Sequence, residues 1–163
     1  MINSLQRNDL DVIVELQSDP LVKSITQGYV FPHADEAIAL WFEKIRNPGE
    51  NPKNLYWAIR DKNQCIGFCT LQQIDWINRK AEVGIVIKEK QKGFGSEALR
   101  ELISIARDSY GLRKLYAKIL AVNEPALRLF ASMQFREEGL LQEDYFFEGS
   151  WCDNYIYSIM LSK

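Results

Sequence analysis

The sequence predicts a mixed α/β (α+β) fold in which one sheet is flanked by helices, and three observations support this. Two segments with apolar residues at helical spacing come first, three segments with strand character follow, and the second half alternates helix, strand, helix and hairpin. The chain has 163 residues, of which 47% are hydrophobic, so it can bury one sizeable core. We therefore expect a single domain over residues 1–163.

The N-terminal third is expected to form a pair of helices. Asn8 or Asp9 can cap the first helix, and Asp19-Pro20 ends it. The second helix is predicted to begin near Ala34 and to end before Asn47-Pro48-Gly49.

The middle of the chain is expected to form an antiparallel meander. Its strands are predicted at Leu55–Ile59, Cys65–Ile74 and Ala81–Ile87, and polar turns separate them. The second half then adds a helix over Ser96–Tyr110, a strand over Lys114–Val122, a short helix over Pro125–Met133, and two strands over Leu140–Phe147 and Cys152–Leu161.

Composition argues against several classes of function. The 20 Lys and Arg nearly balance the 22 Asp and Glu, so no strong field would recruit nucleic acid or an anionic membrane. Three cysteines and one histidine suggest neither a disulfide framework nor a metal site. Because the chain has no apolar run long enough to span a membrane and no signal-like start, we expect it to be cytoplasmic.

The most informative segment is the glycine-bearing loop between the third predicted strand and the helix that follows. Backbone N–H groups at a helix start can converge on an anion, and Gly93 and Gly95 let phosphate oxygens approach the main chain. Lys90 and Lys92 add positive charge. The alternative interpretation is an ordinary turn, since glycine is the usual turn residue.

Two other phosphate motifs compete for this loop. The nucleotide P-loop needs Gly-Lys-Ser or Gly-Lys-Thr, whereas Gly93 is followed by Phe94. The dinucleotide fingerprint matches the glycine spacing, but it should open a parallel unit whose next strand ends in an acid. Here that strand ends in Asn123 and antiparallel strands precede the loop, so the context disfavours dinucleotide binding.

The loop and a second segment together resemble the GCN5-related N-acetyltransferase (GNAT) superfamily. Lys90-Gln91-Lys92-Gly93-Phe94-Gly95 is similar to the family's pyrophosphate loop, with Lys90 or, in another alignment, Gln91 at its first position. The segment from Asn123 to Phe135 resembles the family's Asn-x-x-Ala-x-x-x-Tyr-x-x-x-Gly-Phe segment. Both motifs are in the family's order, and the likeness is greatest to ribosomal-protein N-terminal and spermidine acetyltransferases.

This resemblance implies a mixed, mostly antiparallel sheet that splays between its fourth and fifth strands and binds acetyl-CoA there. It implies that the pantetheine arm lies along one strand edge and the pyrophosphate on the loop. The implied cofactor-binding residues are Ile85, Val86, Ile87, Lys90, Gln91, Lys92, Gly93, Phe94, Gly95, Ser96, Asn123 and Phe130.

The resemblance also implies transfer of acetyl to a primary amine, which must lose a proton before or during its attack. Glu82 is the candidate base, because partial burial in an apolar strand would raise its pKa. Phe130 stands where the family has the tyrosine that protonates the departing thiolate, so either Tyr116, Tyr145 or water replaces that tyrosine, or coenzyme A leaves as a thiolate and is protonated later.

The acceptor is the least defined part of the prediction. Phe31, Trp76, Tyr145 and Trp151 are the candidate substrate-binding residues, with ordinary packing as the alternative. A protein N-terminus, a polyamine or a small amine such as an amino sugar would fit. A non-catalytic acyl-CoA sensor, motivated by Phe130, is the competing function. A homodimer is compatible with the sequence, which does not reveal the oligomeric state.

Overall fold

The computed structural model describes residues 1–17, 19, 22, 35–88 and 93–161. Within these ranges the strands form one seven-stranded sheet of order β1-β2-β3-β4-β5-β7-β6. The strands are β1 (Ile2–Ser4), β2 (Leu55–Asp61), β3 (Gln64–Asp75), β4 (Lys80–Ile87), β5 (Lys114–Leu120), β6 (Arg136–Phe147) and β7 (Ser150–Met160).

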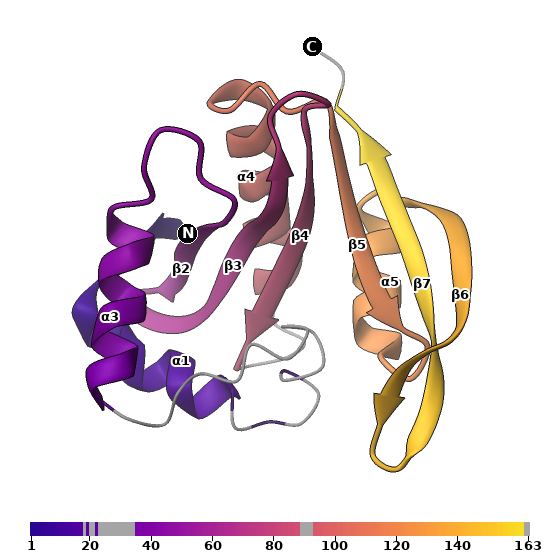
Figure 1. The fold of residues 1–163 in the computed structure, drawn as a ribbon, viewed down its shortest axis with the longest axis horizontal. Helices are drawn as coiled ribbons and strands as arrows, with labels where there is room; N and C mark the ends of the chain where they lie inside the picture. The colour runs from indigo at the N-terminus through magenta and orange to yellow at the C-terminus, as the bar shows by residue number, and fades with distance from the viewer. Residues whose placement is uncertain (18, 20–21, 23–34, 89–92, 162–163) are drawn as a thin grey trace.

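Helices cover the two faces of this sheet unequally. Helices α1 (Leu10–Gln17) and α3 (Asp35–Arg46) lie on one face over the first strands, while α4 (Phe94–Asp108) and α5 (Glu124–Ser132) lie on the other (Figure 1). Two buried clusters reflect this arrangement: a smaller one joins Ile13 and Phe42 to Phe68, and a larger one joins Leu99 and Leu102 to the opposite face. The α1 and α3 face of β5 and β7 is left open by the helices that the structure describes (Figure 1).

The predicted meander is confirmed, since β2, β3 and β4 pair antiparallel in chain order. Lys62 and Asn63 connect β2 to β3 with φ of 44° and 70°. Glu148 and Gly149 connect β6 to β7 with φ of 48° and 84°. Two successive positive φ values are typical of the type I′ hairpin turn, whose twist matches that of the strands it joins.

Helix α1 begins at Leu10, directly after Asp9 as predicted, but neither Asn8 nor Asp9 is the N-cap residue of this segment. A 3₁₀ turn at Arg7–Asp9 precedes α1, and Gln6 is its N-cap residue. The Asp9 carboxylate accepts a hydrogen bond from the Gln6 backbone N–H at 2.8 Å. It also forms an ion pair with the Arg60 guanidinium at 2.6 Å. Strand β1 was not predicted, because three residues are too few to display a periodicity.

The glycine-bearing loop does open a parallel unit, although the antiparallel strands before it led us to expect none. Strand β4, helix α4 and strand β5 form a β-α-β unit in which β4 and β5 pair parallel. The remaining neighbours in the sheet are antiparallel, so the sheet is mixed and is not a doubly wound dinucleotide-binding sheet.

Candidate active site

The sheet splays between β4 and β5, as the resemblance implied. These strands pair only through Lys80↔Lys114, Ala81↔Leu115 and Glu82↔Tyr116. Beyond Glu82, β4 continues to Ile87 without β5, while β5 continues to Leu120 paired with β7. Figure 1 shows the two strands diverging from this junction toward the start of α4.

The splay leaves main-chain groups of β4 without a strand partner. The N–H of Lys88, the residue after β4, donates to the Ile66 carbonyl at 2.8 Å. Lys88 and every second residue before it therefore hydrogen-bond to β3. Antiparallel strands alternate hydrogen-bonded and non-hydrogen-bonded pairs, which directs the N–H and C=O groups of Val83, Ile85 and Ile87 away from β3 and toward β5. This is an edge to which an amide-rich ligand can add as a strand would.

The start of α4 lies at the open end of the splay. Gly93 is the N-cap residue with φ of 81°, and Phe94, Gly95 and Ser96 form the first turn, whose N–H groups have no acceptor within the helix. A Cβ on Gly95 would lie 3.3 Å from Leu129, so α4 and α5 pack closely here. The N–H groups and the helix dipole make this end suited to a phosphate group. Lys90, Gln91 and Lys92 lie outside the described residues.

Replacing Gly93 tests this helix start. Gly93→Val is expected to weaken coenzyme A binding about 10-fold, because a β-branched residue at φ of 81° costs roughly 1–2 kcal/mol and displaces the turn that presents the amides. Gly93→Asn is the matched control, since asparagine tolerates this conformation and, apart from its chain neighbours, no atom of the described residues lies within 4 Å of the added Cβ. Isothermal titration calorimetry with coenzyme A measures both. Equal loss of affinity in the two variants would contradict the conformational explanation.

Glu82 is buried at the junction of the two strands, with 6% of its surface exposed. Burial raises the pKa of its carboxyl group, and the positive charge of Lys118 opposes that rise more weakly. Its Oε2 accepts a hydrogen bond from the Gln73 Nε2 at 3.4 Å. Gln73 reaches Glu82 from an irregularity in β3, where its φ is 48° and the register with β4 shifts. Gln73 was not singled out from the sequence, because no local pattern signals a bulge at that position.

Two β5 residues share the face of Glu82. Tyr116 is its direct partner across the parallel ladder, and Lys118 follows two residues later, on the same side of the strand. Burial raises the pKa of the Tyr116 hydroxyl, and the charges of Glu82 and Asp75 raise it further. Tyr116 therefore stays protonated at neutral pH and can donate a hydrogen bond or a proton.

Asn123 and Phe130 have clear structural contacts. The Asn123 side chain caps α5 by accepting a hydrogen bond from the Ala126 N–H at 3.3 Å. Phe130 is 3% exposed and packs edge-to-face on Phe135 with ring centroids 4.9 Å apart. This position therefore contributes to the core and supplies no hydroxyl group.

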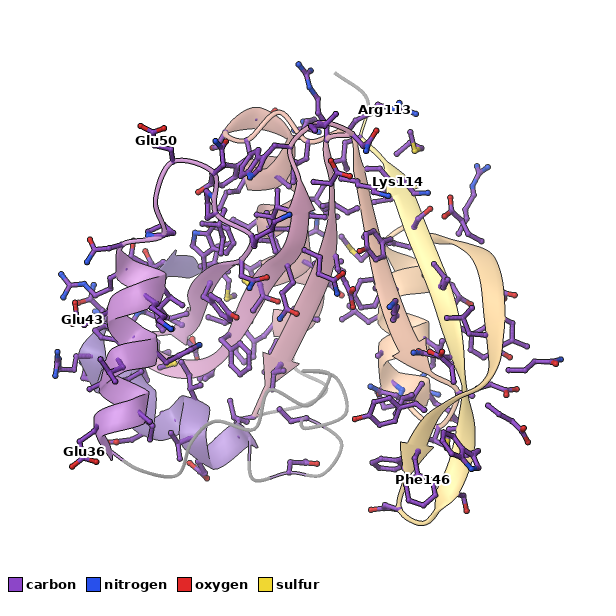
Figure 2. The ribbon with its side chains drawn as sticks, in the orientation of Figure 1. Glu36, Glu43, Glu50, Arg113, Lys114 and Phe146 are labelled. Atoms are coloured by element: carbon purple, nitrogen blue, oxygen red, sulfur yellow. The ribbon has the colours of Figure 1, made fainter. Side chains whose placement is uncertain are left out.

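The predicted substrate-binding residues are not gathered in one place. The Trp76 indole N–H donates to the Pro52 carbonyl at 3.1 Å and its ring contacts Tyr110, on the α4 side of the sheet. Trp151 packs on Phe146 near the exposed tip of the β6–β7 hairpin, where Figure 2 labels Phe146. Strand alternation places Tyr145, opposite Cys152, on the Glu82 face of the sheet and Trp151 on the other. Phe31 lies outside the described residues.

Among the residues that the structure describes, no helix is long and apolar enough to cross a membrane. The His, Cys, Asp and Glu side chains of these residues form no group of three or more that could hold a metal ion.

The parallel unit, the splay after Glu82 and the glycine-initiated helix define an acyltransferase fold that can hold a coenzyme A thioester. Residues 1–136 match the family model described as Acetyltransferase (GNAT) domain. The chain therefore belongs to the GNAT family, and it is an N-acetyltransferase.

Individual relatives agree with this assignment. The chain is 29% identical to the Uncharacterized N-acetyltransferase p20 of Bacillus licheniformis, over 98% of this chain and 91% of the relative. It is 27% identical to the Spermidine N(1)-acetyltransferase of Vibrio cholerae serotype O1, over 99% and 93%. A crystal structure of spermidine N-acetyltransferase from Vibrio cholerae in complex with CoA and spermine matches with a TM-score of 0.85 and 25% identity, over 98% and 94% of the two chains.

Proposed function

We propose that this enzyme transfers acetyl from acetyl-CoA directly to a primary amine at the junction of β4 and β5, with Glu82 as the base. The observation that carries this proposal is the position of Glu82, a buried carboxylate at the last β4–β5 pair. The free edge of β4, which suits pantetheine, begins next to Glu82. The open face of β5 and β7 also lies next to Glu82.

The cofactor side of the proposal rests on two features of the described residues. The main chain of Ile85 and Ile87, two of the predicted pantetheine-binding residues, and of Val83 can hydrogen-bond the amides of pantetheine, whereas the main chain of Val86, also predicted to do so, faces β3 opposite Phe68. The first turn of α4 can bind the pyrophosphate. From Ile87 to Val83 the strand rises by about 13 Å, at roughly 3.3 Å per residue. In the proposed complex this length brings the thioester to Glu82. Lys90, Gln91 and Lys92 are proposed to complete the phosphate loop, and Asn123, the N-cap residue of α5, is a further proposed cofactor-binding residue.

In the proposed reaction, Glu82 accepts a proton from the acceptor amine as the nitrogen lone pair attacks the thioester carbonyl carbon. A free N–H of β4 stabilises the negative charge that develops on the carbonyl oxygen. The carbon–sulfur bond then breaks, and coenzyme A leaves with its sulfur as a thiolate. Phe130 has no proton to give, so Tyr116, Tyr145 or water protonates that sulfur; Tyr116 is supported by its place beside Glu82 and by its raised pKa.

The acceptor classes proposed are a polyamine, a protein N-terminus or a small amine. The Vibrio cholerae relative named for spermidine supports the first, and an N-alpha-acetyltransferase of Sulfolobus acidocaldarius, 30% identical over 48% of this chain, supports the second. Phe130 motivates the competing proposal of an acyl-CoA sensor that does not turn over.

A thiol-release assay with acetyl-CoA and a panel of amines tests the proposal, together with calorimetry of coenzyme A binding. We expect micromolar to millimolar binding of coenzyme A and amine-dependent release of its thiol, as is usual for enzyme substrates. Binding without thiol release for every amine would favour the sensor. No binding of coenzyme A would contradict both proposals.

A further inference from the structure

A lysine without an ion-pair partner lies beside Glu82, at the point where the splay opens. Lys118 is half-buried on β5, two residues beyond Tyr116, the last β5 residue that pairs with β4. Its partner on β7 is Ile156. Among the described residues no carboxylate forms a salt bridge with Lys118, and Glu82 is the acid whose charge it influences.

Lys114 on the same strand provides a direct comparison. It shares the strand face of Lys118, but its Nζ lies 2.7 and 2.8 Å from the two oxygens of Glu138. Figure 2 shows Lys114 at the closed end of the splay, where β4 and β5 are still paired. The ammonium group at the closed end is therefore neutralised by the protein, whereas the one in the opening has no such partner among the described side chains.

A half-buried ammonium group without a salt bridge is energetically unfavourable, because it has lost part of its hydration and, among the described residues, interacts with Glu82 only through space. An anion supplied by a ligand would remove that cost. The phosphates of coenzyme A are poorly placed for this, since the start of α4 follows Ile87, about 16 Å along β4 from Glu82 at roughly 3.3 Å per residue, whereas Lys118 is two residues along β5 from the partner of Glu82. The acceptor, which must reach Glu82, is the nearer source.

We propose that Lys118 binds an acidic group of the acceptor, so that the preferred substrate is an amine carrying a carboxylate or similar anion a few bonds away, as in an amino acid. This rests on the proposed acetyl transfer at Glu82. Lys118 lies two residues along β5 from Tyr116, the strand partner of Glu82, and its charge acts on Glu82, so one small molecule can contact both side chains. A polyamine would instead place a second ammonium group against Lys118, which is repulsive.

The test compares acceptors that differ by one carboxylate: ornithine with putrescine, and phenylalanine with phenethylamine. The wild-type enzyme is expected to show a kcat/KM about 10-fold or more higher for the acid-bearing member of each pair, as expected for a charge-assisted contact. Lys118→Met should bring that ratio close to one, and Lys118→Glu should reverse it in favour of putrescine. Lys114→Met is the matched control and should keep the wild-type ratio.

Calorimetry with coenzyme A accompanies these assays, and its affinity should be the same in Lys118→Met and the wild type. A wild-type preference for putrescine, or a ratio that Lys118→Met leaves unchanged, would overturn the proposal while leaving acetyl transfer intact. A loss of coenzyme A affinity in Lys118→Met would assign this lysine to the cofactor instead. Absence of turnover with every amine would contradict the proposed reaction itself, and this role of Lys118 with it.

Discussion

Replacing Glu82 with glutamine is expected to lower kcat for amine acetylation by about 10²–10⁴-fold, the usual contribution of a positioned base. Glutamine has nearly the same shape and can still accept a hydrogen bond from Gln73, but it cannot take a proton. Steady-state thiol release measures the effect, and calorimetry should show nearly unchanged coenzyme A affinity. Because burial disfavours the charged form of Glu82, the substitution should not lower the melting temperature.

The pH dependence of the rate gives a second signature of this role. A base must be ionised to act, so wild-type kcat is expected to fall as the pH drops through the pKa of Glu82 in the enzyme–substrate complex. Burial raises that pKa above the usual glutamate range, which moves the loss of activity toward neutral pH. The acid limb due to Glu82 should be missing from Glu82→Gln. Glu124→Gln, in an exposed pair with Arg128, is the control and should retain the wild-type profile. An acid limb identical in Glu82→Gln and the wild type would exclude Glu82 as the base.

Gly67→Ala is expected to be the most destabilising small substitution in the sheet, lowering the free energy of unfolding by about 3 kcal/mol. A Cβ at Gly67 would lie 2.2 Å from the Val86 carbonyl oxygen and 2.9 Å from the Ile87 Cα. Both atoms belong to the β4 backbone, so no side-chain rotation can relieve the contact. Gly67 lies next to a register shift between β2 and β3, where a glycine allows close approach of neighbouring strands.

Urea denaturation measures this effect, with Gly139→Ala as the matched control. Gly139 also lies in a strand beside a register shift, but among the residues that the structure describes only its chain neighbours lie within 4 Å of a Cβ added there. That variant should be as stable as the wild type or slightly more so, because alanine costs less conformational entropy than glycine. Gly67→Ala should also weaken coenzyme A binding, since it displaces the end of β4 that leads into the phosphate loop. Equal unfolding midpoints for the two variants would contradict the packing argument.

The sequence by itself determined the order and type of most elements. Helical and strand periodicities are local, and so are the turn residues: α4 ends at Asp108, and Gly111, with φ of 61°, lies in the turn that follows, while the turn at Glu148-Gly149 joins β6 to β7 as predicted. The glycine-bearing loop and the Asn123 segment were enough to indicate the GNAT family, which the family model confirms. Short β1 and the capping by Gln6 escaped prediction because their signals are too short or arise from tertiary contacts.

Only the tertiary structure decided where the strands separate and what lies at that junction. The parallel pairing of β4 with β5 ends at Glu82, and it joins residues more than 30 positions apart in the chain. The same pairing determines the burial of Glu82, and it places Tyr116 and Lys118 on the face of that carboxylate. Burial and electrostatic neighbours depend on strands that are distant in sequence, so a local pattern can suggest a reactive residue but cannot give its surroundings.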